Sequence, residues 1–115
     1  MLEIGDIKIY LCTGNTDMRK GVNGLSALAA TVLKENFCKS CMFIFRGKRA
    51  DKIKSLWWDG QGFCLFYKCL DSGKFIWPKS DEQATLMITR GQFSMLIESI
   101  DWRNPTWSNA PTHAE

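Results

Sequence analysis

The sequence has little of what enzymes use: its 115 residues include a single histidine, and the common catalytic motifs are missing. His113 lies close to the C-terminus in a segment that nothing fixes, so a cysteine nucleophile would have no positioned histidine base. A G-x-S-x-G elbow, a P-loop and a dinucleotide-binding glycine pattern are all missing. These absences predict a protein that is not an enzyme and that uses no cofactor.

A cluster of carboxylates is the remaining catalytic option. Asp17, Asp59 and Asp101 would suit Mg²⁺ and phosphoryl transfer if the fold brought them within a few Å. Each also has a local explanation, at a helix start, in a hairpin turn and at a helix end. We therefore predict no metal site. A metal-dependent nuclease stays as a further hypothesis, which would be ruled out if the three carboxylates lie far apart in the structure.

Long apolar runs and the features of a secretion signal are absent as well. No run approaches the roughly 18 residues of a membrane span, and the first residues are acidic where a signal peptide is positive. We expect a cytoplasmic protein. Without linkers or repeats, the length predicts one domain over residues 1–104, and the prolines beyond it predict a flexible tail over residues 105–115.

The five cysteines are expected to be free, reduced thiols, the default in the cytoplasm. Cys38 and Cys41 form a C-x-x-C pair, and Cys64 with Cys69 forms a wider one. Zinc sites favour two tight pairs in loops or turns, whereas Cys64 falls within a predicted strand. A redox C-x-x-C normally opens a helix, whereas Cys41 enters a strand. Buried or incidental thiols are the preferred interpretation, and a role for Cys38 and Cys41 stays open.

The apolar pattern predicts an α+β domain in which two helices lie on an antiparallel sheet of about five strands, in the order β-α-β-β-β-(β)-α. The Asp59-Gly60 pair predicts a hairpin, and Thr89 with Gln92 predicts a capping box. Aromatic residues on both sheet faces indicate that both are covered, by the segment with Trp102 and Trp107 or by a partner chain. Strands are expected over residues 7–11, 42–45, 56–58, 63–67, 75–77 and 86–88, and helices over residues 17–34 and 90–100.

Positive charge is concentrated in the connection between the second and third predicted strands. Five cations stand there against the single acid Asp51, a surplus of four, whereas the whole chain carries +3. Such a loop can follow a phosphate backbone, positioning DNA rather than reading its sequence, although lysine runs are also common on solvated surfaces. The candidate DNA-binding residues are Arg46, Lys48, Arg49, Lys52 and Lys54, with Arg19 and Lys20 in support if the fold brings them near.

Exposed aromatic residues offer an alternative, a surface for protein partners. The adjacent Trp57 and Trp58 point to opposite faces of a strand, so at most one of them could stack on a nucleic-acid base. Core packing for one and a covering contact for the other are favoured. Trp58, Trp77 and Trp102 are the candidate protein-contact residues.

Four segments together resemble a known family. They are residues 13–21 (TGNTDMRKG), 43–49 (FIFRGKR), 54–62 (KSLWWDGQG) and 100–103 (IDWR). In this combination and order they are similar to the TnpB accessory proteins, the second open-reading-frame products of insertion sequence 66-type transposable elements. The resemblance runs from about residue 7 to residue 105, and the cysteines are not part of it.

This resemblance implies a bacterial protein of a mobile element, needed for transposition beside a DDE-type transposase and another small accessory protein. It implies no known catalytic role and no cofactor. We therefore expect a non-enzymatic accessory factor of DNA recombination that binds the element ends through its basic loop, with self-association as a possibility. The alternative is a module that contacts the transposase or its own copies without binding DNA.

Overall fold

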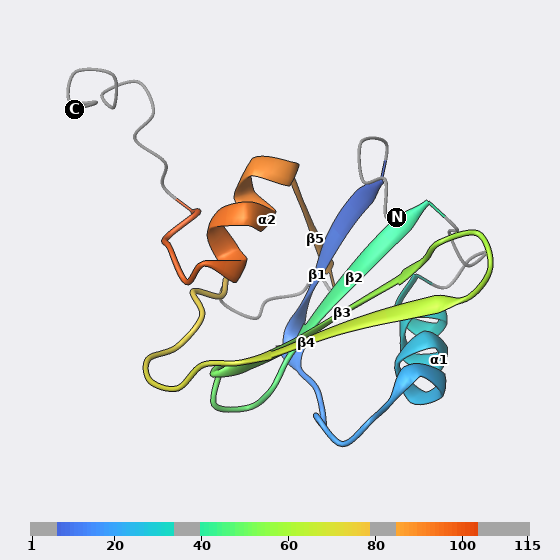
Figure 1. Ribbon diagram of the computed structural model, residues 1–115, viewed down its shortest axis with the longest axis horizontal. Helices are drawn as coiled ribbons and strands as arrows, with labels where there is room; N and C mark the ends of the chain where they lie inside the picture. Colours follow the sequence, from blue (N-terminus) through green and yellow to red (C-terminus); the bar gives the residue numbers. More distant parts are fainter. Residues whose placement is uncertain (1–6, 34–39, 79–84, 104–115) are drawn as a thin grey trace.

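The computed structural model describes residues 7–33, 40–78 and 85–103, which form a five-stranded mixed sheet with one helix on each face (Figure 1). The strands lie side by side in the order β4-β3-β2-β1-β5. In chain order the elements are β1 (Lys8–Asn15), α1 (Val22–Leu33), β2 (Cys41–Arg46), β3 (Lys52–Trp58), β4 (Phe63–Cys69), β5 (Thr85–Ile88) and α2 (Arg90–Ile97). The predicted α+β class, with five strands and two helices, is confirmed.

The antiparallel β2-β3-β4 meander forms as predicted, and its centre is buried on both faces. Met42 and Ile44 pack toward α2, whereas Phe43 and Phe45 pack toward α1, so β2 reads as an unbroken apolar run. At the β3–β4 hairpin the Asp59 carboxylate accepts hydrogen bonds from the backbone N–H groups of Gln61 and Gly62, at 2.9 and 3.0 Å. Gly60 has a φ of 104°, a conformation that favours glycine, so the Asp-Gly signal identified this turn correctly.

One strand pairing differs from the all-antiparallel sheet that the sequence predicted. β1 lies parallel to β2, from Lys8 opposite Cys41 to Leu11 opposite Ile44, and antiparallel to β5. The reason is that α1 connects β1 to its neighbour β2, and a crossover of this kind returns the chain to the same end of the sheet. β1 also continues past residue 11, where the predicted strand ended, to Asn15, which pairs with Arg46 after an irregularity in the register.

Helix α1 begins at Val22, later than the predicted start at Asp17. Residues before it form a turn in which the Lys20 N–H donates to the Asp17 carbonyl, at 3.1 Å. The carbonyls of Met18 and Lys20 accept hydrogen bonds from the Lys54 ammonium instead of from a helix backbone. Within the chain, a Cβ atom at Gly21 would meet open space, and one at Gly24 would meet the Lys20 side chain.

The second face of the sheet is covered by α2 and by two extended segments. The predicted capping box is present, since the Thr89 hydroxyl accepts from the Gln92 N–H and the Gln92 side chain accepts from the Thr89 N–H. The predicted strand over residues 75–77 is wrong, because this segment joins no sheet, although Phe75 enters the core. Trp102 packs into the same core, so its segment helps to cover this face, which was one of the two alternatives that the sequence left open. Trp107 and the tail predicted over residues 105–115 lie outside the described residues.

Two apolar clusters therefore sandwich the sheet, one under each helix. Among the described residues no helix is long and apolar enough to cross a membrane. Gly47 follows β2, at the point where the β1–α1 connection meets the β2–β3 turn. A Cβ atom there would lie 2.8 Å from the Met18 Cγ atom, so only glycine lets the β1–α1 connection pack this closely on the β2–β3 turn.

Candidate nucleic-acid interface

The β2–β3 turn is held on two sides by backbone hydrogen bonds, which fixes the backbone at its tip. Within the turn the Ala50 N–H donates to the Gly47 carbonyl at 3.0 Å. On its outer side the Phe75 N–H donates to Ala50 and the Leu70 N–H donates to Asp51, at 2.7 and 2.8 Å. Lys48 and Arg49 are exposed at this tip, as the sequence predicted.

Lys54 does not lie on the surface, which corrects its placement in the exposed basic loop. Only 6% of it is exposed, and its ammonium donates to the carbonyls of Met18 and Lys20, both at 2.8 Å. The same ammonium lies 4.6 Å from the centre of the Tyr67 ring, within the range of a cation–π contact. Its charge is used inside the protein, where it fastens the β1–α1 connection to β3.

Arg46 also turns away from the predicted surface, toward the opposite face of the sheet. Its guanidinium donates to the Gly47 carbonyl at 3.0 Å and lies 5.9 Å from the centre of the Trp77 ring. Its Nε atom is buried without a hydrogen-bond partner. Arg46 and Lys54 therefore point to opposite faces of the sheet. Lys54 pairs with Phe45 across the two strands and shares its face, whereas Arg46 follows Phe45 in β2 and points to the other face.

The other cations gather around an open cleft of about 570 Å³ between the β1–α1 connection and the β2–β3 turn. Arg19 lies on one side, and Lys48, Arg49 and Lys52 lie on the other; Tyr67 also lines the cleft. The fold thus brings Arg19 to the basic turn, which was the condition that the sequence set for its role. Lys20 is exposed next to Arg19 but does not line the cleft.

Two acids reduce the positive charge of this cleft. The Asp17 carboxylate lies 2.8 Å from the Arg19 guanidinium, and the Asp51 carboxylate lies 3.7 Å from the Lys52 ammonium. The hydrogen bond from the Arg19 side chain is the main cause that lowers the pKa of Asp17 to about 2, so this carboxylate stays ionised near neutral pH. Four cations against two acids leave the cleft a surplus of two positive charges.

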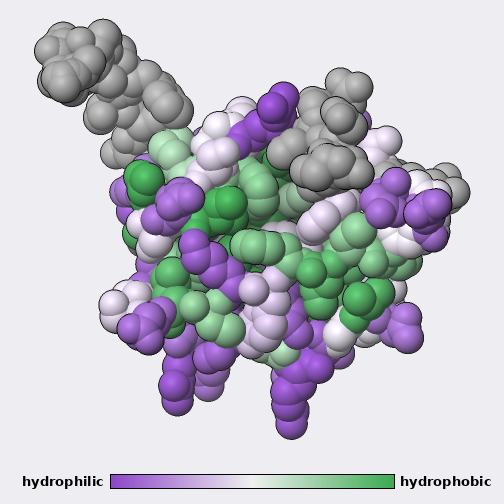
Figure 2. All heavy atoms as spheres, viewed as in Figure 1, coloured by the Kyte–Doolittle hydropathy of each residue, from purple (hydrophilic) through white to green (hydrophobic). Residues whose placement is uncertain are grey.

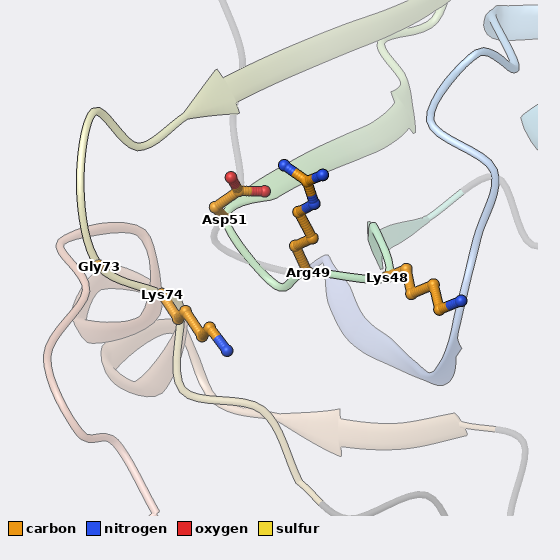
Figure 3. Close-up of a pocket in the computed structure, with 5 residues that line it drawn as sticks. All are labelled: Lys48, Arg49, Asp51, Gly73 and Lys74. Atoms are coloured by element: carbon orange, nitrogen blue, oxygen red, sulfur yellow. The ribbon is translucent and has the colours of Figure 1, made fainter.

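A second hollow, of about 610 Å³, lies on the other side of the β2–β3 turn (Figure 3). Lys48, Arg49, Asp51, Gly73 and Lys74 line it. In the close-up Lys48 points toward the β1–α1 connection, whereas Lys74 approaches from the segment that follows β4. Lys74 was not among the predicted residues, because only the backbone bonds from residues 70 and 75 bring its segment to the turn.

Together these residues form one cationic edge of the molecule, which we call the basic edge. It is defined by Arg19, Lys20, Lys48, Arg49, Lys52 and Lys74. Figure 2 shows hydrophilic side chains protruding at the lower border of the view, where Figure 1 places the β1–α1 connection and the β2–β3 turn.

The aromatic candidates lie differently from the exposed surface that was predicted. Trp102 is 3% exposed and donates its indole N–H to the Ile76 carbonyl at 2.9 Å, so it belongs to the core. Trp77 is half-buried, with its indole N–H bonded to the Cys12 carbonyl at 3.2 Å. Trp58 is half-buried and packs edge-on against Phe63. The three side chains thus form no common exposed surface.

The three candidate carboxylates are each held by local contacts. Asp17 pairs with Arg19, Asp59 closes its own turn, and Asp101 accepts from the backbone and side chain of Arg103 at 3.0 and 3.1 Å. In residues 7–33, 40–78 and 85–103 no group of three or more histidine, cysteine, aspartate or glutamate side chains is arranged to hold a metal ion.

The cysteines agree only in part with the expectation of reduced thiols. Cys12, Cys64 and Cys69 are free, and burial raises the pKa of the Cys12 thiol to about 12, which makes it unreactive. Cys41 is disulfide-bonded, which corrects the prediction for that residue. Cys38 lies outside the described residues.

Fold and surface define a small α+β protein with a cationic edge, and comparison with known proteins adds the family. The chain belongs to the IS66 Orf2-like proteins, whose family model matches residues 7–107. These are accessory proteins associated with transposition of insertion sequences, and no catalytic role is known for them. The resemblance that the four sequence segments indicated is therefore confirmed.

Two relatives come from Sinorhizobium fredii (strain NBRC 101917 / NGR234). The uncharacterized protein y4hO is 42% identical over 107 residues, covering 93% of this chain and 92% of y4hO. The uncharacterized protein y4jC is 39% identical over 97 residues, covering 84% of this chain and 81% of y4jC. No solved structure matches the chain.

Proposed function

We propose that the protein is a non-enzymatic accessory factor that binds DNA at the ends of its element through the basic edge and helps to assemble the transposase complex. One observation carries this proposal. Arg19 and the turn residues Lys48, Arg49 and Lys52 come from segments far apart in the sequence, and they line one open cleft. Lys74 extends the same charge on the other side of the turn.

The geometry suits a phosphate backbone better than a small anion. The cations are exposed and spread along two adjoining hollows, whereas a small-anion site needs donors that converge within one buried pocket. The backbone bonds of the β2–β3 turn hold the backbone of Lys48 and Arg49 in place before binding, so little backbone conformational entropy is lost on contact. Contacts of this kind position DNA and leave the reading of its sequence to other groups.

A salt-titrated binding assay with terminal-repeat DNA tests the proposal. Each phosphate contact adds about 0.9 to the slope of log affinity against log salt for duplex DNA. Replacing both Lys48 and Arg49 with Ala should reduce that slope by about 2 and weaken binding roughly tenfold or more.

The matched control removes the same charge elsewhere. Lys8 and Arg90 are exposed cations that line neither hollow, so replacing both with Ala should change the slope much less. Circular dichroism of both double variants checks the fold. Equal losses in the two double variants would mean that only net charge matters, and the basic edge would not be the binding surface.

The transposase and the other small accessory protein of the element are the proposed protein partners. With Trp102 in the core, the contact surface proposed from the sequence reduces to the half-buried Trp58 and Trp77. Co-purification with the transposase separates the two roles: a DNA-binding factor loses DNA and keeps the transposase when Lys48 and Arg49 are replaced. An interaction module would instead show no DNA binding by the isolated chain and would still co-purify with the transposase.

A further inference from the structure

Strand β4 forms one border of the sheet, and within the described ranges no strand pairs with its outer side (Figure 1). It is seven residues long and contains no proline. Its register with β3 is regular from Lys52 opposite Cys69 to Trp58 opposite Phe63, so no bulge twists it away. A long, regular edge of this kind offers a row of backbone hydrogen-bonding groups to another strand.

Devices that normally protect such an edge are missing from β4. Its only charged residue is Lys68, and the Lys68 ammonium is engaged by the Ile97 carbonyl, at 2.6 Å, at the end of α2. Phe66 and Tyr67, by contrast, are 39% and 47% exposed. In the space-filling view apolar residues gather over the region of β4 (Figure 2). An exposed apolar edge without a free charge is an association surface.

We propose that β4 pairs with β4 of a second copy of this chain, antiparallel and centred on Phe66, so that two sheets join into one. A two-fold axis perpendicular to the sheet maps each face onto itself, so the axis must pass at a residue rather than between two residues. With the axis at the middle of the strand, Phe66 faces its own copy, and Leu65 of one chain faces Tyr67 of the other.

This register also matches the charges. Lys68 of one copy faces Cys64 of the other, so no like charges stand opposite each other. Asp59 lies in the turn before β4 and Lys74 lies in the segment after it, and both are exposed. Antiparallel pairing brings the Asp59 end of each copy toward the segment of the other that carries both Asp71 and Lys74, whose opposite charges cancel.

The dimer does not depend on DNA binding, although it has a consequence for it. Tyr67 lines the cleft of the basic edge, and the two-fold axis keeps equivalent faces on the same side of the joined sheet. Both clefts would then face one side of the dimer. A single duplex could contact both copies, with the gain in affinity that two linked contacts provide.

Sedimentation equilibrium from about 1 to 500 µM tests the dimer, a range that suits a small interface. The full chain should associate to a dimer, and Phe66→Glu should remain a monomer with an unchanged circular dichroism spectrum. Met87→Glu is the matched control, because Met87 is 56% exposed on β5, the opposite edge strand. The control should dimerise as the unmodified chain does.

A monomeric unmodified chain over this range would overturn the proposal, as would a dimer that Met87→Glu abolishes and Phe66→Glu preserves. Cross-linking provides a readout that does not depend on loss of structure. In a background with Cys64 and Cys69 replaced by Ser, Phe66→Cys should cross-link to its own copy with a short thiol reagent, and Met87→Cys should not. No cross-link at position 66 would refute the register.

The two proposals fail separately. DNA binding of monomeric Phe66→Glu should keep the salt slope per chain, because the cations of the basic edge are untouched. A dimer without DNA affinity would leave the edge pairing standing and remove the proposed function.

Discussion

At the scale of single residues, a lysine side chain stabilises the fold at one position and is exposed on the surface at another. Lys48 and Lys54 lie in one basic segment of the sequence, yet only the first reaches solvent. The difference comes from the fold, since the β1–α1 connection passes over β3 and offers two backbone carbonyls to the Lys54 ammonium. A lysine buried in this way contributes to stability and not to binding.

Replacing Lys54 with Met should destabilise the protein by about 1–3 kcal/mol, because two partly buried carbonyls lose their charged donor. Chemical denaturation in urea measures this change. Lys48→Met, at the exposed tip of the turn, is the control and should change the free energy of unfolding by less than about 0.5 kcal/mol. Equal stability of Lys54→Met and the unmodified protein would show that the lysine holds nothing.

Asp17 should titrate well below the ordinary aspartate range. Hydrogen bonds from the side chain and backbone of Arg19 lower its pKa to about 2 from an ordinary 3.8. Because the folded pKa is the lower one, any stability that this pair adds is present above the ordinary value and is lost as the pH falls toward 2. NMR titration of the carboxyl carbon should show a midpoint near 2, rising toward the ordinary value in Arg19→Ala. An unshifted midpoint in the unmodified protein would mean that the pair does not form in solution.

At the scale of elements, local signals in the sequence were sufficient where an element is stabilised from within. The Asp-Gly turn and the Thr89 capping box formed as predicted, because their hydrogen bonds join residues two or three positions apart. The start of α1 and the parallel pairing of β1 were missed, because distant groups decide them. Lys54 takes the carbonyls of the expected first turn, and the α1 crossover sets the direction of β2.

Thr89→Ala should cost about 1 kcal/mol of stability, since the Gln92 N–H loses its acceptor at the start of α2. Urea denaturation followed by circular dichroism measures this loss. Ser94→Ala, at an exposed position within the same helix, is the control and should be neutral or slightly stabilising. Identical free energies of unfolding for the two variants would show that the cap does not hold the helix.

At the scale of the whole molecule, the basic edge is assembled from three separate parts of the chain. The sequence could indicate Lys48, Arg49 and Lys52, because they are close together and rich in charge. It could not show that Arg46 and Lys54 turn to opposite faces, nor that Lys74 joins the edge, because strand alternation and long-range backbone bonds decide these placements. The concentration of charge in the sequence indicated where the basic edge lies, and the fold determines which residues belong to it.

The central claim is that DNA meets this protein along the basic edge, and NMR of the full chain titrated with terminal-repeat duplex tests it most directly. Amide signals of residues 16–20, 47–52 and 73–74 should shift together, and the shifts should disappear as salt is raised. Signals from residues of α2 and β5 should stay in place, except for any residue that lies next to Lys74. Shifts confined to α2 and β5, or no shifts at low salt, would contradict the claim.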